Sequence, residues 1–240
     1  MFKKIVGLLL IINLTACTGV NLDQALGTVL EGLEGGELTN AQIGSGLKEA
    51  LQIGIGKGAD KLSLTDGYFK SAYKILLPEE AQKLTNRLQN VPGFSQVENK
   101  ILELINRGAE DAAKSAKPIF VNAIKQMSFQ DATQILMGNR NAATNYLDKT
   151  TRQQLYDAFR PKIVASLNKV NATKYWSDAV GAYNKIPLVQ KINPQLDDYV
   201  TQQALKGLFS MVAKEENTIR TNVNARTSDL LKKVFAKQDR

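Results

Sequence analysis

Residues 197–219 read DDYVTQQALKGLFSMVAKEENTI, and this stretch decides the fold class. Its apolar residues recur mainly at spacings of three and four, as on one face of an α-helix, at Val200, Ala204, Leu205, Leu208, Phe209, Val212 and Ile219. We therefore expect a long helix from about Asp197. Ser228 is placed to cap a further helix that carries Leu230, Leu231, Val234 and Phe235.

A second helical pattern begins at residue 39. Thr39 or Asn40 is placed to cap a helix to about Leu62, with Ile43, Leu47, Leu51 and Ile55 along it. The same stretch contains five glycines: Gly44, Gly46, Gly54, Gly56 and Gly58. Each interior glycine costs a helix about 0.5–1 kcal/mol relative to alanine. We therefore expect close approach of another helix, with a ligand crevice as the alternative.

Turn and capping signals divide the rest of the chain into helices. The expected features, in chain order, are a turn at Thr65-Asp66-Gly67, a helix from Pro78 to Val91, a helix capped by Ser95 and kinked or interrupted at Pro118, a helix opened by Ser128 and closed by Gly138 as a left-handed terminator, a helix from near Ala142, a cap at Thr151 before a helix kinked at Pro161, and an aromatic-rich helix over 173–184.

Strand-length runs of alternating apolar and polar residues are almost absent. The predicted fold is therefore all-α, a single domain over residues 39–240 of about eight to ten helices, several of them kinked at prolines.

The N-terminus has the anatomy of an export signal. Lys3 and Lys4 precede an apolar run from Ile5 to Leu14, about half the length that a membrane-spanning helix needs. The following Leu14-Thr15-Ala16-Cys17 resembles the lipobox of bacterial lipoproteins, which implies cleavage after residue 16 and lipid on Cys17. Residues 17–38 would then form the lipidated N-terminus and a tether. Thr18, in place of aspartate, resembles lipoproteins sorted to the outer membrane, so we expect a lipid-anchored envelope protein that faces the periplasm.

Composition excludes much catalytic chemistry. The chain has no histidine and one cysteine, Cys17, so a Ser-His-Asp triad, a Cys-His pair and an imidazole or thiolate zinc site within this chain are excluded. We expect no cofactor and no metal. The formal net charge of +8 is spread along the chain, and no nucleic-acid-binding motif is found, so nucleic acid is not an expected partner.

Three polar clusters remain as candidate sites. Glu110 lies one helical turn from both Asn106 and Arg107. The three side chains either line a groove or, at the surface, include a local Arg107–Glu110 ion pair. Glu216 precedes Arg220 by four residues, the spacing of an ion pair, and Arg226 follows in a polar turn. These six residues form our candidate binding patch. Asn139-Arg140-Asn141 is most simply a turn between helices.

A set of short motifs is spread over residues 40–236. They are Gly46-Leu47-Lys48-Glu49-Ala50-Leu51, Leu62-Ser63 with Asp66-Gly67-Tyr68, Asn106-Arg107 with Ala109-Glu110, Ala142-Ala143-Thr144 with Tyr146, Gly207-Leu208-Phe209, Glu216 with Ile219-Arg220, Ala225-Arg226-Thr227, and Leu230-Leu231 with Val234-Phe235. With these motifs the chain resembles a known bacterial family, domain of unknown function family 4197. The resemblance implies one exported or envelope-associated helical domain, and it implies no particular activity.

Two classes of function are compatible with these patterns. The first, which we favour, is a non-enzymatic lipid-anchored module that binds or scaffolds an envelope protein, lipid or glycan; no oligomeric state follows from the sequence. The second is a carboxylate-dependent enzyme that acts on cell-wall glycan, with Glu110 or Glu216 as the acid. Exposure and pairing of these two carboxylates distinguish the classes: an unpaired carboxyl group in a deep cleft favours the enzyme.

Overall fold

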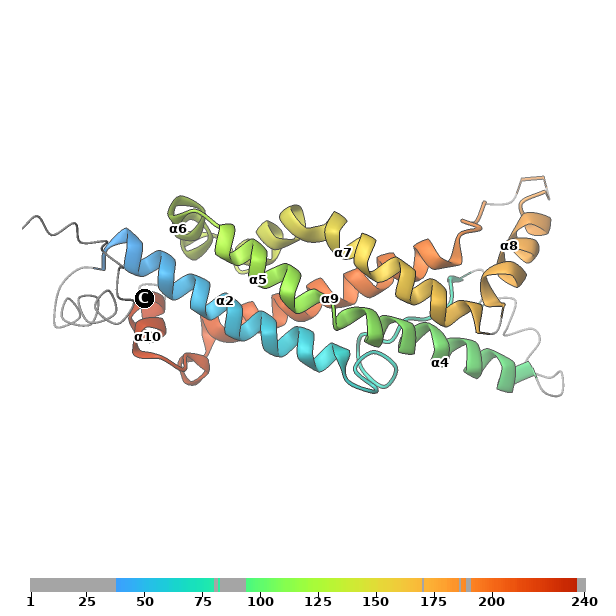
Figure 1. Ribbon diagram of the computed structural model, residues 1–240, viewed down its shortest axis with the longest axis horizontal. Helices are drawn as coiled ribbons and strands as arrows, with labels where there is room; N and C mark the ends of the chain where they lie inside the picture. The colour runs from blue at the N-terminus through green and yellow to red at the C-terminus, as the bar shows by residue number, and fades with distance from the viewer. Residues whose placement is uncertain are drawn as a thin grey trace, which may run out of the picture. The chain divides into compact units, whose positions relative to one another are not determined.

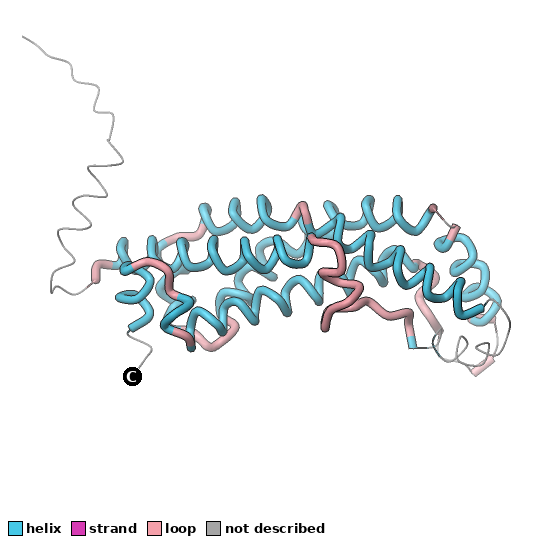
Figure 2. The backbone as a smooth tube through the Cα atoms, turned by 90° about the horizontal axis from the view of Figure 1, so that it is seen from below, coloured by secondary structure: helices cyan, strands magenta, loops and turns pink. Residues whose placement is uncertain are grey.

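The computed structural model describes residues 38–79, 82, 94–169, 171–185, 187–188 and 191–236. These residues form helices and loops, with no strand among them (Figures 1 and 2), so the all-α prediction is confirmed. The elements are α2 (Asn40–Ser63), α4 (Phe94–Ala113), α5 (Ala116–Gln126), α6 (Phe129–Met137), α7 (Ala142–Asn168), α8 (Ala172–Tyr183), α9 (Leu196–Thr221), the 3-10 helix η1 (Val223–Ala225) and α10 (Asp229–Phe235).

The long helix α9 is the shared packing partner of the domain. It lies against α2, α4 and α7, while α4 and α5 follow one another along α7 (Figure 1). Its apolar stripe is buried as its spacing predicts, including Val200, Leu205 and Leu208 at 0% exposure. The fold thus rests on the stretch whose helical periodicity is plainest.

The glycines of α2 allow neighbouring helices to approach closely. A methyl carbon built on Gly46 would lie 2.7 Å from Val234 Cγ2 of α10, and one built on Gly54 would lie 2.8 Å from Ile219 Cδ1 of α9. At Gly44 the corresponding distance, to Phe129 Cδ1 of α6, is 2.5 Å. The prediction of close helix packing is confirmed, because side chains of α6, α9 and α10 fill the space beside the glycines.

Three capping predictions are confirmed. Thr39 caps α2 through a reciprocal capping box with Gln42, Ser128 does the same for α6 with Asp131, and Ser228 accepts a hydrogen bond from the Leu231 amide at the start of α10. Local sequence signals of this kind are reliable because all their partners lie within one turn of the helix.

Gly138 ends α6 as predicted, but its predicted conformation and the predicted helix start at Thr151 are wrong. Gly138 follows α6 in an extended conformation, with φ of −79° and ψ of −174°, not as a left-handed terminator. A methyl carbon there would lie 2.7 Å from Ala142 Cβ, so crowding accounts for the glycine. Thr151 starts no helix, because α7 runs unbroken from Ala142 to Asn168; its hydroxyl donates to the Leu147 carbonyl at 2.6 Å, within the helix.

The other boundaries differ in detail. Ser95 lies inside α4, which begins at Phe94, and the break between α4 and α5 comes before Pro118, which occupies the first turn of α5, where proline is tolerated. α7 continues through Pro161. Most of the helix expected from Pro78 to Val91 lies outside the described residues. The single helix α7 thus replaces the two shorter helices expected from near Ala142 and after Thr151.

Candidate functional site

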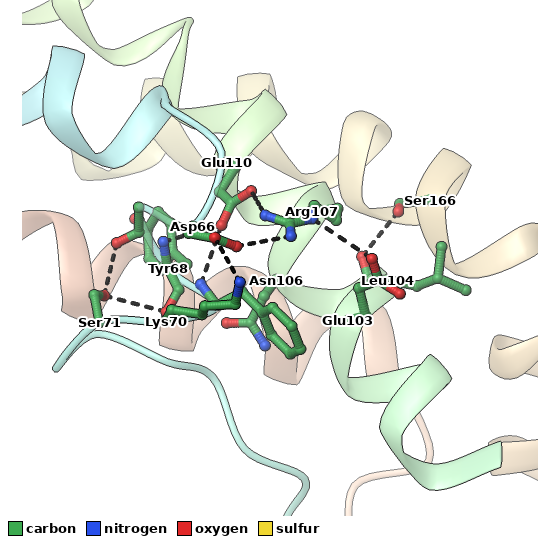
Figure 3. A network of polar contacts seen from close by, with 12 residues as sticks. Asp66, Tyr68, Lys70, Ser71, Glu103, Leu104, Asn106, Arg107, Glu110 and Ser166 are labelled. Carbon is green, nitrogen blue, oxygen red and sulfur yellow. Dashed lines mark hydrogen bonds and ion pairs between the residues drawn. The ribbon is translucent and has the colours of Figure 1, made fainter. Parts of the chain in front are cut away.

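The candidate residues fall into two clusters built from different elements. The first, which we call the loop clamp, comprises Asn106, Arg107 and Glu110 of α4 together with Asp66 of the loop over residues 64–78 (Figure 3). The second, the helix junction, comprises Glu216, Arg220 and Arg226, which contact the ends of α6, α7 and α9. The six predicted residues therefore do not form one continuous patch.

Glu110 holds the beginning of the loop. It is 4% exposed, and its Oε1 accepts hydrogen bonds from the backbone amides of Tyr68 at 3.1 Å and Phe69 at 3.0 Å. Its Oε2 accepts one from Arg107 Nη1 at 2.7 Å. Both oxygens are thus engaged by N–H donors of the protein itself, which is how a buried charge is accommodated.

Asn106 holds the far part of the same loop. Its side chain is fully buried, its Oδ1 accepts from the Ile75 amide at 2.8 Å, and its Nδ2 donates to the Ile75 carbonyl at 2.9 Å and the Leu102 carbonyl at 2.8 Å. The amide therefore pairs with Ile75 much as a neighbouring strand would. Because the loop over residues 64–78 forms no helix or strand, the Asn106 side chain supplies the hydrogen-bond partners of the Ile75 backbone N–H and C=O groups.

Arg107 and Asp66 form the accessible rim of the loop clamp. Their side chains are 30% and 32% exposed, and Arg107 Nη2 lies 2.8 Å from Asp66 Oδ1. The hydrogen bond from Arg107, followed by that from Lys70, lowers the pKa of Asp66 below its ordinary value of 3.8. Bonds to Glu110 and Asp66 raise the pKa of Arg107. The Arg107 guanidinium also lies over the Phe69 ring, with 5.2 Å between Cζ and the ring centre.

Tyr68 fastens the same loop to α9. Its ring is fully buried, and its hydroxyl donates to the Ala204 carbonyl at 2.8 Å. A methyl carbon on Gly207 would lie 2.9 Å from the Tyr68 ring, so this glycine makes room for it. Burial raises the pKa of the Tyr68 hydroxyl, with the charge of Glu110 as a second cause. The hydroxyl therefore acts as a structural donor.

Glu216 takes over the capping of α7. Asn141, the residue before α7, makes no side-chain capping bond. Instead, Glu216 of α9 accepts from the amides of Ala143 at 3.0 Å and Thr144 at 2.9 Å, and from the Thr144 hydroxyl at 2.8 Å. A carboxylate at a helix N-terminus satisfies amides that lack helical partners and interacts favourably with the helix dipole.

Arg220 completes this junction at the end of α6. Its guanidinium pairs with Glu216 Oε1 at 2.8 Å and donates to the carbonyls of Ile135 at 2.8 Å and Leu136 at 3.1 Å. The sequence-based prediction of a Glu216–Arg220 ion pair is confirmed. Because α6 ends where α7 begins, one buried ion pair caps the C-terminus of the first helix and the N-terminus of the second.

Arg226 secures the end of α9. It is 2% exposed, donates to the carbonyls of Ile219 at 3.1 Å and Arg220 at 3.0 Å, and lies 5.6 Å over the Phe235 ring of α10. It thereby joins α9 to α10. The guanidinium of Arg226 thus contributes hydrogen bonds, and its methylene groups contribute apolar packing.

The cavity beside the helix junction is small. Its volume is about 10 Å³, and Glu216 and Arg220 line it together with Leu47, Leu51, Ile219 and Phe235. This is roughly the space that one water molecule requires. The cavity has no room for a sugar ring, so Glu216 does not open into a substrate-sized cleft there.

The sequence indicates the pairs within α4 and within α9 but not the partners that come from distant segments. It does not indicate the amides of residues 68, 69 and 75 or the carbonyls of residues 135 and 136, because every residue carries such backbone groups. It also does not indicate the Tyr68 hydroxyl, whose acceptor is the carbonyl of the distant Ala204. Asp66 was noted only as part of a turn, although its φ of 69° and its pairing with Arg107 place it in the loop clamp. The turn over residues 139–141 is exposed.

The described residues include no candidate metal site and no candidate membrane span. Among the described residues, no group of three or more acidic, histidine or cysteine side chains has the geometry of a metal site. In the same part of the chain, no helix combines the length and the apolar character that crossing a bilayer requires.

Comparison with known proteins identifies a family. No curated protein and no solved structure matches this chain. A family model, described as protein of unknown function (DUF4197), matches residues 37–236, which include every described helix. The resemblance noted in the sequence is thereby confirmed. The chain belongs to the DUF4197 family.

Proposed function

We propose that this chain is a lipid-anchored envelope protein whose helical domain binds or scaffolds a partner and catalyses no reaction. The proposed anchor is lipid on Cys17, and the proposed location is the outer membrane, facing the periplasm. The leader of residues 1–16 and the lipobox-like Leu14-Thr15-Ala16-Cys17 support the anchor. Several acyl chains on one residue hold a protein at a membrane persistently, whereas a single chain holds it only marginally.

One observation carries the non-enzymatic part of the proposal. Glu110 and Glu216, the two candidate acids, are buried, and both oxygens of each accept hydrogen bonds from the protein's own N–H or O–H groups. A glycan-cleaving acid must instead direct a proton at a bound substrate. The enzyme is therefore the weaker candidate, since its proposed acids serve as caps and clamps.

The anchor is tested by Cys17→Ser in cells that are fed a labelled fatty acid. We expect the native chain to incorporate label and fractionate with membranes. The variant should lose the label and retain its leader. Thr18→Ser, at the next position, is the matched control and should behave as the native chain does. Normal processing and membrane fractionation of Cys17→Ser would refute the lipid anchor.

The binding role is tested by crosslinking the native lipoprotein in cells and identifying what is captured. We expect the same envelope protein, lipid or glycan to be recovered with the native chain and to be lost from Cys17→Ser. Hydrolysis of purified cell-wall glycan by the native protein, abolished in Glu110→Gln or Glu216→Gln variants that remain folded, would instead establish the enzyme.

A further inference from the structure

We infer that one end of the helical domain rests on an anionic phospholipid surface. This end, called the entry end below, consists of the start of α2, helix α6 and the turn over residues 137–141. The inference rests on the lipid anchor proposed above, and it adds the orientation of the domain and the class of surface that it contacts.

Two large apolar side chains are exposed at the entry end. Phe129 is 52% exposed and Met137 is 67% exposed, at the first and last positions of α6. Phe129 lies against Gly44, near Thr39, where α2 is capped. The start of α2, α6 and α10 lie at the same end of the helices, and α8 lies at the other (Figure 1). Helix α6, which carries both side chains, therefore lies at the end of the domain where α2 begins.

Basic residues lie on the helices and the turn that carry or adjoin these apolar side chains. The Lys48 ammonium lies 5.7 Å from the Phe129 ring centre and donates to the Lys125 carbonyl at 3.2 Å. The side chains of Lys125 and Arg140 are exposed. Asp131, the acid within α6, accepts hydrogen bonds from both the amide and the hydroxyl of Ser128 in the capping box. The entry end thus combines insertable apolar groups with a positive rim, which complements an anionic headgroup layer.

The position of the anchor selects this end over others of similar chemistry. Leu188, with Lys185 and Lys191, is fully exposed beyond α8, and Leu64, with Lys70, is exposed on the loop after α2. A chain tethered through residues 17–38 enters at Thr39, so the effective concentration of membrane is greatest at the entry end. Electrostatic attraction and apolar insertion then add to the lipid anchor.

The test places a fluorescent reporter at each of the three positions. Cys17 is the only cysteine of the chain and carries lipid in the anchored protein. A second cysteine introduced as Met137→Cys, Leu64→Cys or Leu188→Cys is then the only free thiol. Each acylated variant is labelled with an environment-sensitive fluorophore and reconstituted into vesicles of phosphatidylethanolamine and phosphatidylglycerol. Some of the acyl chains carry a nitroxide quencher.

We expect a blue shift and quenching at position 137, with neither at positions 64 and 188. Adding Arg140→Glu should reduce the quenching at 137, whereas the matched Lys185→Glu at the far end should not. Raised salt, or replacement of phosphatidylglycerol by phosphatidylcholine, should reduce it as well, because exposed charges are screened within about 10 Å at 0.1 M salt.

Each contrary outcome has a definite meaning. Absence of quenching at 137, or quenching at 64 or 188 as strong as at 137, overturns the proposed orientation. Quenching at 137 that is indifferent to Arg140→Glu and to lipid charge overturns the anionic surface. If Cys17 reacts with the fluorophore and the protein does not float with the vesicles, the chain has no lipid anchor. That result refutes the proposed function, on which this inference rests.

Discussion

At the scale of single residues, Glu216 illustrates how a buried charge serves the fold. We expect Glu216→Gln to lower the free energy of unfolding by about 3 kcal/mol, because it leaves the buried Arg220 guanidinium without its carboxylate. The neighbouring, half-buried Glu215 provides the matched control, and Glu215→Gln should change stability by less than about 0.5 kcal/mol. Urea unfolding of both variants measures the difference. Equal stabilities would mean that the cap of α7 does not depend on this charge.

Asp66 provides a test that depends on pH. The Arg107 hydrogen bond and, less strongly, the Lys70 bond hold the folded-state pKa of Asp66 below 3.8. This pairing therefore stabilises the fold fully above pH 3.8 and is lost as the pH falls below it, through the folded-state pKa. Carboxyl NMR titration should show the Asp66 pKa rising toward 3.8 in Arg107→Gln, and by less in Lys70→Gln. The reverse order would contradict the assigned cause.

At the scale of elements, the glycines of α2 set how closely its neighbours pack. Gly46→Ala should destabilise the protein by about 1–3 kcal/mol, because the new methyl group would lie 2.7 Å from the stiff, branched Val234 of α10. Gly56→Ala, whose nearest neighbour is Lys117 Cε at 3.5 Å, should stabilise it by about 0.5–1 kcal/mol through helix propensity. Thermal unfolding measures both variants, and the same sign for the two would refute the packing role of Gly46.

The boundaries of elements show where sequence reasoning succeeds. The start of α6 is predictable, because Ser128 and Asp131 cap it within one turn. The start of α7 is only partly predictable from the sequence, because its capping group, Glu216, belongs to another helix about seventy residues away. In addition, Thr151 has the sequence pattern of a local cap although it lies inside α7. Local signals fix a boundary only when both partners of the cap are local.

At the scale of the whole molecule, the all-α class, the capped starts of α2, α6 and α10 and the Glu216–Arg220 pair follow from the sequence alone. Their physical basis is short range: helical periodicity, one-turn capping and the i, i+4 spacing. Only the tertiary structure decided that Glu110 holds the loop after α2 and that Glu216 caps α7. Their partners are backbone amides from distant segments, and long-range packing alone brings such amides to a carboxylate.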